Sequence, residues 1–179
     1  SAALNLACEK NLDLSSMTIG IAGVGNVGSK VAKIAKALGM RTLLNDPPRE
    51  RKEGGDFVPL ENIISESYII TLLVPLNDHG IDKTFHIAGK DFFSAVRHAP
   101  IFINTSRGEV CDTKALKDAI RKQIISCAVI DVWENEPGID LELLSLAKFA
   151  TPHIAGYSTD GKANGTAMSV RAASRFFYL

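Results

Sequence analysis

Three residues with complementary chemistry, Arg107, Glu136 and His153, each follow a short apolar segment in the second half of the chain. The forked guanidinium of an arginine can hold a carboxylate through two hydrogen bonds and polarise a neighbouring carbonyl group. A histidine beside a carboxylate can take a proton from an alcohol near neutral pH and return it to a ketone. The set therefore suits hydride transfer to or from a 2-hydroxy acid.

Taken alone, each of the three has an ordinary structural explanation: a solvated loop arginine, a Glu-Pro turn and a hydrogen-bonded histidine. In open α/β sheets, however, ligands gather beyond the carboxyl ends of the strands. The coincidence of these residue types at three successive strand ends therefore favours a site. The other histidines, His79, His86 and His98, lack this placement and are predicted to be turn or surface residues.

A glycine-rich turn, Gly23-Val24-Gly25-Asn26-Val27-Gly28, follows the apolar run Thr18–Ala22 and opens an amphipathic segment. In such a pattern the first glycine permits a tight turn, the second lets the backbone approach a pyrophosphate, and the third brings helix close to strand. The amino terminus of the helix then favours the negative phosphates. A purely structural glycine turn is the alternative. The predicted cofactor contacts here are Gly23, Gly25, Asn26, Val27 and Gly28.

Asp46 ends the next apolar run, where an acidic residue can hold the ribose of a dinucleotide. Its carboxylate would accept hydrogen bonds from both ribose hydroxyls and repel a 2′-phosphate, so the sequence predicts NAD rather than NADP as cofactor. Asp131 ends a later apolar run at the same edge of the predicted sheet. It is predicted either to bond the nicotinamide amide or to cap the turn that follows.

Short apolar runs that alternate with helical patterns predict an α/β fold with a Rossmann-type doubly wound parallel sheet. The predicted strands are 18–22, 41–45, 68–73, 100–104, 124–130 and 149–150. The predicted helices are 27–38, which Gly39 ends, 60–65, 88–98 and 113–122, the last capped by Asp112. The stretch Asp46–Asp56, rich in proline and glycine, is predicted to be a loop over the adenosine end of the cofactor.

The composition of the chain limits the classes of partner that it is expected to bind. Of its 179 residues, 46% are hydrophobic, enough to bury one substantial core. Its 20 lysines and arginines balance 20 aspartates and glutamates, so no net field attracts nucleic acid or a membrane surface. The sequence shows neither a membrane-spanning run nor a signal-peptide pattern. Cys8, Cys111 and Cys127 lack metal-ligand spacing, so we expect no metal, a packing role for Cys111 and a reducing cytoplasm.

Both ends of the chain carry apolar residues at helical spacing, over residues 1–14 and about 159–179. A helix with an apolar stripe normally buries it against another element. We therefore expect the two terminal helices to pack against each other and against polypeptide absent from this chain. In the alternative, the two helices cap this domain's own core.

Four motifs together resemble the D-isomer-specific 2-hydroxyacid dehydrogenases. They are the glycine-rich turn, Asn104–Glu109, Asp131–Pro137 and Thr151–Gly156, and their order and spacing match throughout. The resemblance implies that Arg107 and Glu136 are catalytic and that His153 donates or accepts the proton. It also implies cofactor contacts at Asp46, Asp131 and Gly156, a backbone or apolar cofactor contact at Val74, and substrate contacts from Arg107 and Tyr157.

Two further stretches, Asp46–Arg49 and Gly156–Lys162, resemble a branch of this family that acts on a phosphorylated 2-hydroxy acid on the way to pyridoxal 5′-phosphate. The resemblance also implies a homodimer. It further implies that residues 1–179 are one nucleotide-binding domain, whose terminal helices over 1–14 and about 159–179 cross to a substrate domain absent from this chain. Two alternatives stay open. A sibling dehydrogenase for 3-phosphoglycerate, glyoxylate or hydroxypyruvate would use the same three catalytic residues, with Tyr157 and Lys162 as discriminators. A non-enzymatic, NAD-responsive binding protein would share the fold.

Overall fold

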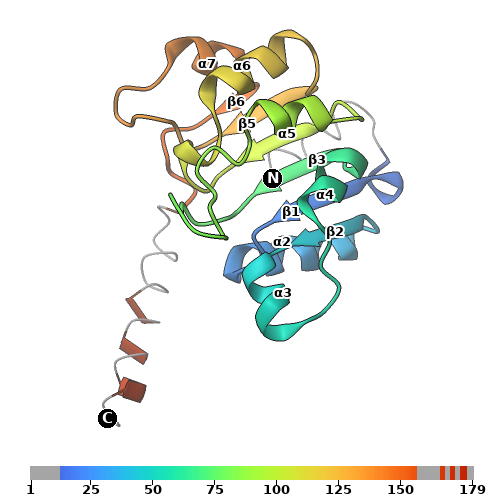
Figure 1. Cartoon of the computed structure of the whole chain (residues 1–179), viewed down its shortest axis with the longest axis vertical. Coiled ribbons are helices and arrows are strands. Elements are labelled where there is room, and N and C mark those ends of the chain that lie inside the picture. The colour runs from blue at the N-terminus through green and yellow to red at the C-terminus, as the bar shows by residue number, and fades with distance from the viewer. Residues whose placement is uncertain (1–12, 157–165, 168–169, 172–173, 177–179) are drawn as a thin grey trace.

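The structure, a computed structural model, describes residues 13–156, 166–167, 170–171 and 174–176. In these ranges six strands form one parallel sheet in the order β2-β1-β3-β4-β5-β6 (Figure 1). This topology confirms the predicted doubly wound fold. The predicted terminal helices over 1–14 and 159–179 fall mostly outside the described residues and stay a prediction.

The strands coincide with the predicted apolar runs, and three of them are shorter than predicted. They are β1 (Thr18–Ala22), β2 (Arg41–Asn45), β3 (Ile69–Leu72), β4 (Ile101–Asn104), β5 (Cys127–Ile130) and β6 (Phe149–Ala150). Strand β1 pairs with β2 on one side and with β3 on the other, so the strand order reverses between β1 and β3. In open α/β sheets a ligand crevice forms beyond the carboxyl ends of the strands at such a switch point.

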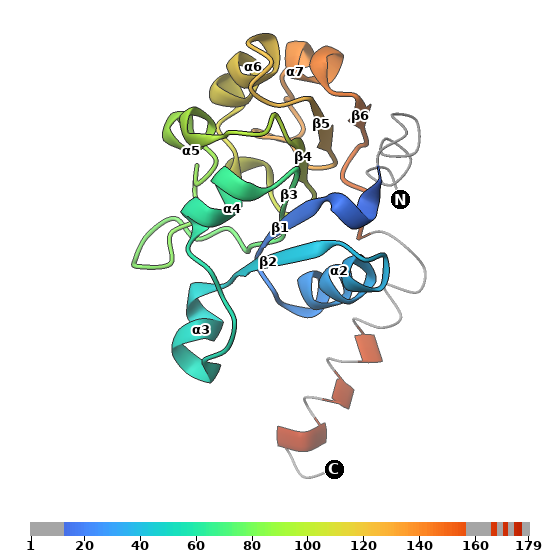
Figure 2. The ribbon, with the colours of Figure 1, turned by 90° about the vertical axis from the view of Figure 1, so that its right-hand side faces the viewer.

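Helices cover both faces of the sheet. They are α2 (Asn26–Ala37), α3 (Pro47–Glu53), α4 (Leu60–Glu66), α5 (Lys90–Ala95), α6 (Thr113–Arg121) and α7 (Leu141–Leu146), with short 3-10 turns η1 (Leu14–Ser16) and η2 (Gly108–Val110). Figure 2 shows α4 and α5 on the face opposite to α2. Asp112 caps α6 as predicted, since its carboxylate accepts from the Ala115 backbone N–H at 2.9 Å. Helix α7 was not predicted from the sequence.

The prediction of a loop over residues 46–56 is wrong, because most of this stretch forms α3. Its two prolines stand in the first turn, where their missing N–H groups would have no partner in the helix anyway. The Asp46 carboxylate caps the helix by accepting from the Arg49 backbone N–H at 3.2 Å. An ion pair between Arg49 and Glu53, one turn apart and 2.6 Å in length, adds to it.

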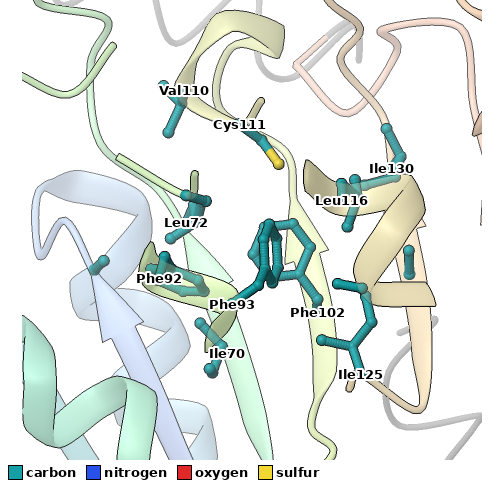
Figure 3. Packing of buried hydrophobic residues seen from close by; sticks show 14 of the residues in the cluster. Ile70, Leu72, Phe92, Phe93, Phe102, Val110, Cys111, Leu116, Ile125 and Ile130 are labelled. Carbon is teal, nitrogen blue, oxygen red and sulfur yellow. The ribbon is translucent and has the colours of Figure 1, made fainter. Parts of the chain in front are cut away.

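The larger core lies under α4, α5, α6 and α7. Phe92, Phe93 and Phe102 pack edge to face with ring centroids 5.2 to 6.1 Å apart (Figure 3). Cys111 belongs to the same cluster and is 4% exposed. Burial, with the nearby charges of Glu134 and Asp112, raises the pKa of its thiol well above the usual value, so the predicted packing role is confirmed.

The opposite face of the sheet carries a groove of about 640 Å³ beside α2. The apolar stripe of that helix forms one wall, and Val27, Ile34 and Leu38 are exposed along it. The groove extends to Asp131 and Ile154, so it adjoins the carboxyl ends of the strands. Among the residues described, helices long and apolar enough to cross a membrane are not found.

Candidate active site

The glycine-rich turn joins β1 to α2 and combines close packing with open space. Gly23 has φ +89°, and a Cβ there would lie 2.6 Å from the Leu73 carbonyl group. A Cβ on Gly28 would lie 2.1 Å from the Gly23 carbonyl oxygen, whereas nothing lies within 4 Å of one on Gly25. The first and third positions therefore exclude side chains for internal reasons, and the second leaves the helix terminus accessible. Backbone N–H groups at such a terminus attract phosphate.

Asp46 is fixed beside this turn at the end of β2. Its carboxylate accepts from the Val24 backbone N–H at 2.8 Å while it caps α3. A cleft of about 440 Å³ lies between α3 and the segment after β3, and its lining includes Gly23, Asp46 and Val74. These residues fit a dinucleotide, with an accessible helix terminus for the phosphates and an acid for the ribose.

The arginine nearest to Asp46 along α3 is already engaged. Arg49 donates to the Glu53 carboxylate at 2.6 Å and to the Val24 carbonyl oxygen at 2.5 Å. A 2′-phosphate at this position would need a cation. Because Glu53 neutralises Arg49 and Asp46 is an acid, the arrangement favours NAD over NADP.

His153 and Glu136 meet at the same edge of the sheet, although they come from different loops. His153 Nδ1 lies 2.8 Å from Glu136 Oε2, and Glu136 Oε1 accepts from the Trp133 backbone N–H at 2.8 Å. Burial raises the pKa of Glu136, but the hydrogen bonds from His153 and Trp133 outweigh that effect, so its pKa lies below the usual value. An ionised Glu136 makes Nδ1 the protonated nitrogen and leaves Nε2 as the basic one.

Asp131 holds the loop that carries His153. The His153 backbone has φ +54°, in the left-handed region that non-glycine residues seldom adopt. Its N–H donates to the Asp131 carbonyl oxygen at 2.7 Å, and the Asp131 carboxylate accepts from the N–H groups of Ile154 and Ala155, each at 2.9 Å. The Thr151 hydroxyl donates to the same carboxylate. The Asp131 carboxylate thus caps the turn that carries His153 and not, as predicted, the turn that directly follows Asp131 in the sequence. The nicotinamide contact stays a prediction.

Trp133 contacts the loops on both sides of its own, namely the loop of His153 and the turn after β4. Its indole N–H donates to the Thr151 carbonyl oxygen at 2.9 Å, across to the His153 loop. On the other side, a Cβ on Gly108 would lie only 2.0 Å from the Trp133 carbonyl carbon. The turn after β4 is therefore packed directly against the loop of Glu136.

Arg107 stands in that turn and is exposed. Its guanidinium donates to the Ser106 carbonyl oxygen at 2.6 Å, and its own carbonyl oxygen accepts from the Asn104 side chain at 3.0 Å. In the described part of the chain no hydrogen bond joins Arg107 to His153 or Glu136. The structure thus brings two of the three predicted catalytic side chains together and places the third on an adjoining turn.

The remaining predicted contacts divide between described and undescribed residues. Val74 lines the cleft beside α3, and Gly156 is exposed, with no described atom beyond its chain neighbours within 4 Å of a Cβ placed on it. Tyr157 and Lys162 lie outside the described residues. Groups of three or more side chains that could hold a metal ion are not found among the residues that the structure places.

Sequence reasoning missed a second histidine–carboxylate pair. His86 lies in a turn, as predicted, and its side chain is 32% exposed, but its Nε2 lies 2.6 Å from Glu134 Oε1, a partner that the sequence reasoning did not identify. The pair joins two loops 48 positions apart in the sequence. The sequence signal for it was slight: an additional glutamate, two positions before Glu136.

Comparison with known families and proteins agrees with this geometry. Residues 6–155 match the sequence profile of the NAD-binding domain of D-isomer-specific 2-hydroxyacid dehydrogenases. An erythronate-4-phosphate dehydrogenase of Bacteroides thetaiotaomicron is 57% identical over 95% of this chain and 49% of that protein. Its counterpart in Pseudomonas fluorescens is 41% identical over 97% of this chain and 46% of that protein. The chain spans about half the length of these relatives.

Solved structures give the same picture. The Aquifex aeolicus D-lactate dehydrogenase, complexed with NAD and lactic acid, matches with a TM-score of 0.76 and 27% identity over 98% of this chain and 61% of that one. The Lactobacillus jensenii D-lactate dehydrogenase with NAD⁺ matches with a TM-score of 0.74 and 26% identity over 94% of this chain and 58% of that one. The chain therefore belongs to the D-isomer-specific 2-hydroxyacid dehydrogenases and contains their NAD-binding domain.

Proposed function

We propose that the intact protein containing this chain oxidises 4-phospho-D-erythronate at C2 to 2-oxo-3-hydroxy-4-phosphobutanoate with NAD. The product leads to pyridoxal 5′-phosphate. Relatives between 41% and 57% identical over nearly the whole chain are erythronate-4-phosphate dehydrogenases. The observation that carries the chemistry is the 2.8 Å contact between His153 and Glu136 beyond the strand ends.

NAD, when bound, takes up the hydride that leaves C2 of the substrate. In the proposal, His153 accepts the proton of the C2 hydroxyl at Nε2, so the carbinol becomes a ketone. Glu136 holds the Nδ1 proton and stabilises the imidazolium that forms. The capped turn at Asp131 supports this role, because it fixes the backbone of His153 through several hydrogen bonds.

Arg107 would bind the carboxylate at C1 of the substrate through its guanidinium and polarise the developing carbonyl group. Its exposure and the rigid turn around Asn104 support this assignment. Tyr157 would supply a further substrate contact. The proposed NAD contacts are Gly23, Gly25, Asn26, Val27, Gly28, Asp46, Val74, Asp131 and Gly156.

We propose that residues 1–179 are the NAD-binding domain, with terminal helices that cross to a substrate domain, and that the intact protein is a homodimer. The resemblance to the family supports both. Cys111 lies in the core as a free thiol, as is usual in reducing compartments, so we place the protein in the cytoplasm. The balanced charge of the chain gives no support to nucleic acid or membranes as partners.

The test is an assay of the intact protein with NAD and a panel of 2-hydroxy acids, followed by NADH absorbance. We expect the highest kcat/KM with 4-phosphoerythronate. A higher value with 3-phosphoglycerate, or with glyoxylate or hydroxypyruvate in the reverse direction, would reassign the substrate. Tight NAD binding without turnover of any member of the panel would favour a non-enzymatic binding protein.

A further inference from the structure

The pair of His86 and Glu134 lines neither the groove beside α2 nor the cleft beside α3, but it shares a loop with the candidate catalytic pair. Glu134 stands two positions before Glu136, and its side chain is 18% exposed. With 2.6 Å between Nε2 and Oε1, this contact is even shorter than that of His153 with Glu136. The proposed reaction uses Glu136 and His153 but gives His86 no part.

The His86 ring is held from several sides. Phe85 stacks on it, with ring centroids 4.0 Å apart and an angle of 22° between the planes. The backbone has φ +51° and donates from its N–H to the Glu109 carbonyl oxygen at 2.8 Å. A left-handed backbone at a non-glycine residue costs free energy and persists where the surroundings fix it. Asp112 Oδ2 lies 4.0 Å from Nδ1, so carboxylates face both ring nitrogens.

Glu134 connects three segments through one carboxylate. Oε1 meets His86, and Oε2 accepts from the backbone N–H of Thr113 at 2.9 Å, at the first residue of α6. Burial raises the pKa of Glu134, but the hydrogen bonds from Thr113 and His86 outweigh this, so its pKa lies below the usual value. The Glu134 carboxylate is therefore an anion at neutral pH.

Glu134 is linked to Glu136 through Trp133, which shares a peptide group with Glu134 and donates its own N–H to Glu136. Gly108 packs against that peptide, with a hypothetical Cβ 2.4 Å from the Glu134 nitrogen. The Trp133 N–H donates to Glu136 Oε1 at 2.8 Å. A shift of the Glu134 backbone would move this donor and, with it, the carboxylate that holds His153.

We propose that His86 is a positioning residue for the proton relay: by clamping Glu134, it fixes the loop that presents Glu136 to His153. The inference rests on the proposed function, because it assigns His86 a part in the same reaction. His86 acts through Glu134 and does not contact the substrate.

The kinetic test uses His86→Ala in the intact protein. We expect kcat to fall about tenfold, since small displacements of catalytic groups have effects of this order, while the Kd for NAD is unchanged. His86→Gln, whose amide can donate to Glu134, should recover kcat to within about twofold of the unsubstituted protein. His98→Ala is the matched control, an exposed histidine that stacks on Tyr68, and should leave kcat unchanged.

A double-variant cycle tests whether His86 acts through Glu134. Glu134→Gln keeps an acceptor for the Thr113 N–H but removes the charge. If the two residues form one clamp, His86→Ala combined with Glu134→Gln should lose no more than the larger single loss. Losses that multiply would overturn the proposal, as would an unchanged kcat in His86→Ala. His86→Asn, which keeps polarity but falls short of Glu134, serves the same cycle if the alanine variant does not fold.

A measurement independent of turnover separates this inference from the proposed function. ¹⁵N-histidine spectra of the intact protein report which nitrogen of His153 carries the proton. We expect a protonated Nδ1 in the unsubstituted protein and in His86→Gln, and a mixture of tautomers in His86→Ala. An unchanged His153 spectrum in His86→Ala overturns the positioning role, even if the enzyme is active. A protein inactive on the whole panel contradicts the proposed function, whereas the tautomer change would still support positioning.

Discussion

Two histidine–glutamate pairs on one loop have similar contacts but different surroundings. His153 is 41% exposed, and its Nε2 has no hydrogen-bond partner among the described residues. His86 is 32% exposed, is stacked by Phe85 and has a carboxylate facing each ring nitrogen. A ring nitrogen that is accessible at the strand ends can exchange a proton with a substrate, whereas one enclosed by carboxylates anchors a loop. The surroundings of the pair, more than the pair itself, therefore distinguish the two roles.

The largest effect on kcat should come from breaking the pair of His153 and Glu136, in which Nε2 of the histidine is accessible. His153→Ala removes the group that is proposed to take the hydroxyl proton, so we expect kcat of the intact protein to fall about a hundredfold or more. The Kd for NAD should stay nearly the same, because the glycine turn and Asp46 lie elsewhere. Steady-state kinetics and NAD titration measure the two quantities. Equal rates in the variant and the unsubstituted protein would refute the assignment.

The charge of the pair formed by His153 and Glu136 can be removed while the hydrogen bond to the Trp133 N–H is kept. Glu136→Gln keeps an oxygen for the Trp133 N–H but no longer stabilises an imidazolium, so we expect kcat to fall about tenfold or more. Because the pKa of Glu136 lies below the usual value, the unsubstituted enzyme should retain this advantage down to more acidic pH than an ordinary glutamate allows. A kcat ratio between the two proteins near one across the pH range would contradict this role.

The predicted NAD site at Asp46 can be tested separately from both histidine–glutamate pairs. Asp46→Ala removes the cap of α3 and the proposed acceptor for the ribose hydroxyls, so we expect NAD to bind about tenfold more weakly and discrimination against NADP to relax. Tautomer spectra of His153 should be unaffected. Titration with each cofactor checks the expectation. An unchanged preference for NAD would mean that other residues hold the ribose.

The smallest expected effect is on the free energy of unfolding and comes from the pair of His86 and Glu134. Since the pKa of Glu134 is lowered in the folded state, its charge stabilises the protein above the usual pKa near 4.5, and this contribution disappears as pH falls through the lowered value. Glu134→Gln should therefore cost about 1 kcal/mol or more in free energy of unfolding at neutral pH, and less in acid.

Urea unfolding at several pH values measures this difference. Asp56→Asn, at an exposed position, is the control for the loss of a carboxylate. A Glu134→Gln difference that does not change with pH would contradict an ionised Glu134 that stabilises the fold.

Periodicity and turn chemistry were sufficient to predict the sheet, because every strand is a short apolar run followed by a polar loop. The loop assigned to residues 46–56 was wrong because proline was weighed as a helix breaker, while its tolerance in a first turn depends on the Asp46 cap. Helix α7 was missed although Asp140 caps it, accepting from the Leu143 N–H at 2.8 Å. Its six residues are too few to show a helical period.

In the candidate site too, the sequence pattern predicted the residues that follow strands but not the contacts made by irregular segments. Arg107, Glu136 and His153 could be selected because each follows a strand, and parallel strands bring their carboxyl ends together. His86 comes from an irregular segment after β3, so nothing in the local pattern indicated its partner. Gly108 likewise becomes informative only when its contact with the Trp133 carbonyl group is known.

The most direct measurement of the central claim is a crystal structure of the intact protein with NAD and 4-phosphoerythronate. We expect Nε2 of His153 about 3 Å from the C2 hydroxyl oxygen, with Nδ1 still bonded to Glu136 and the Arg107 guanidinium on the carboxylate. A substrate whose C2 hydroxyl instead meets another base, with His153 turned away from it, would contradict the account.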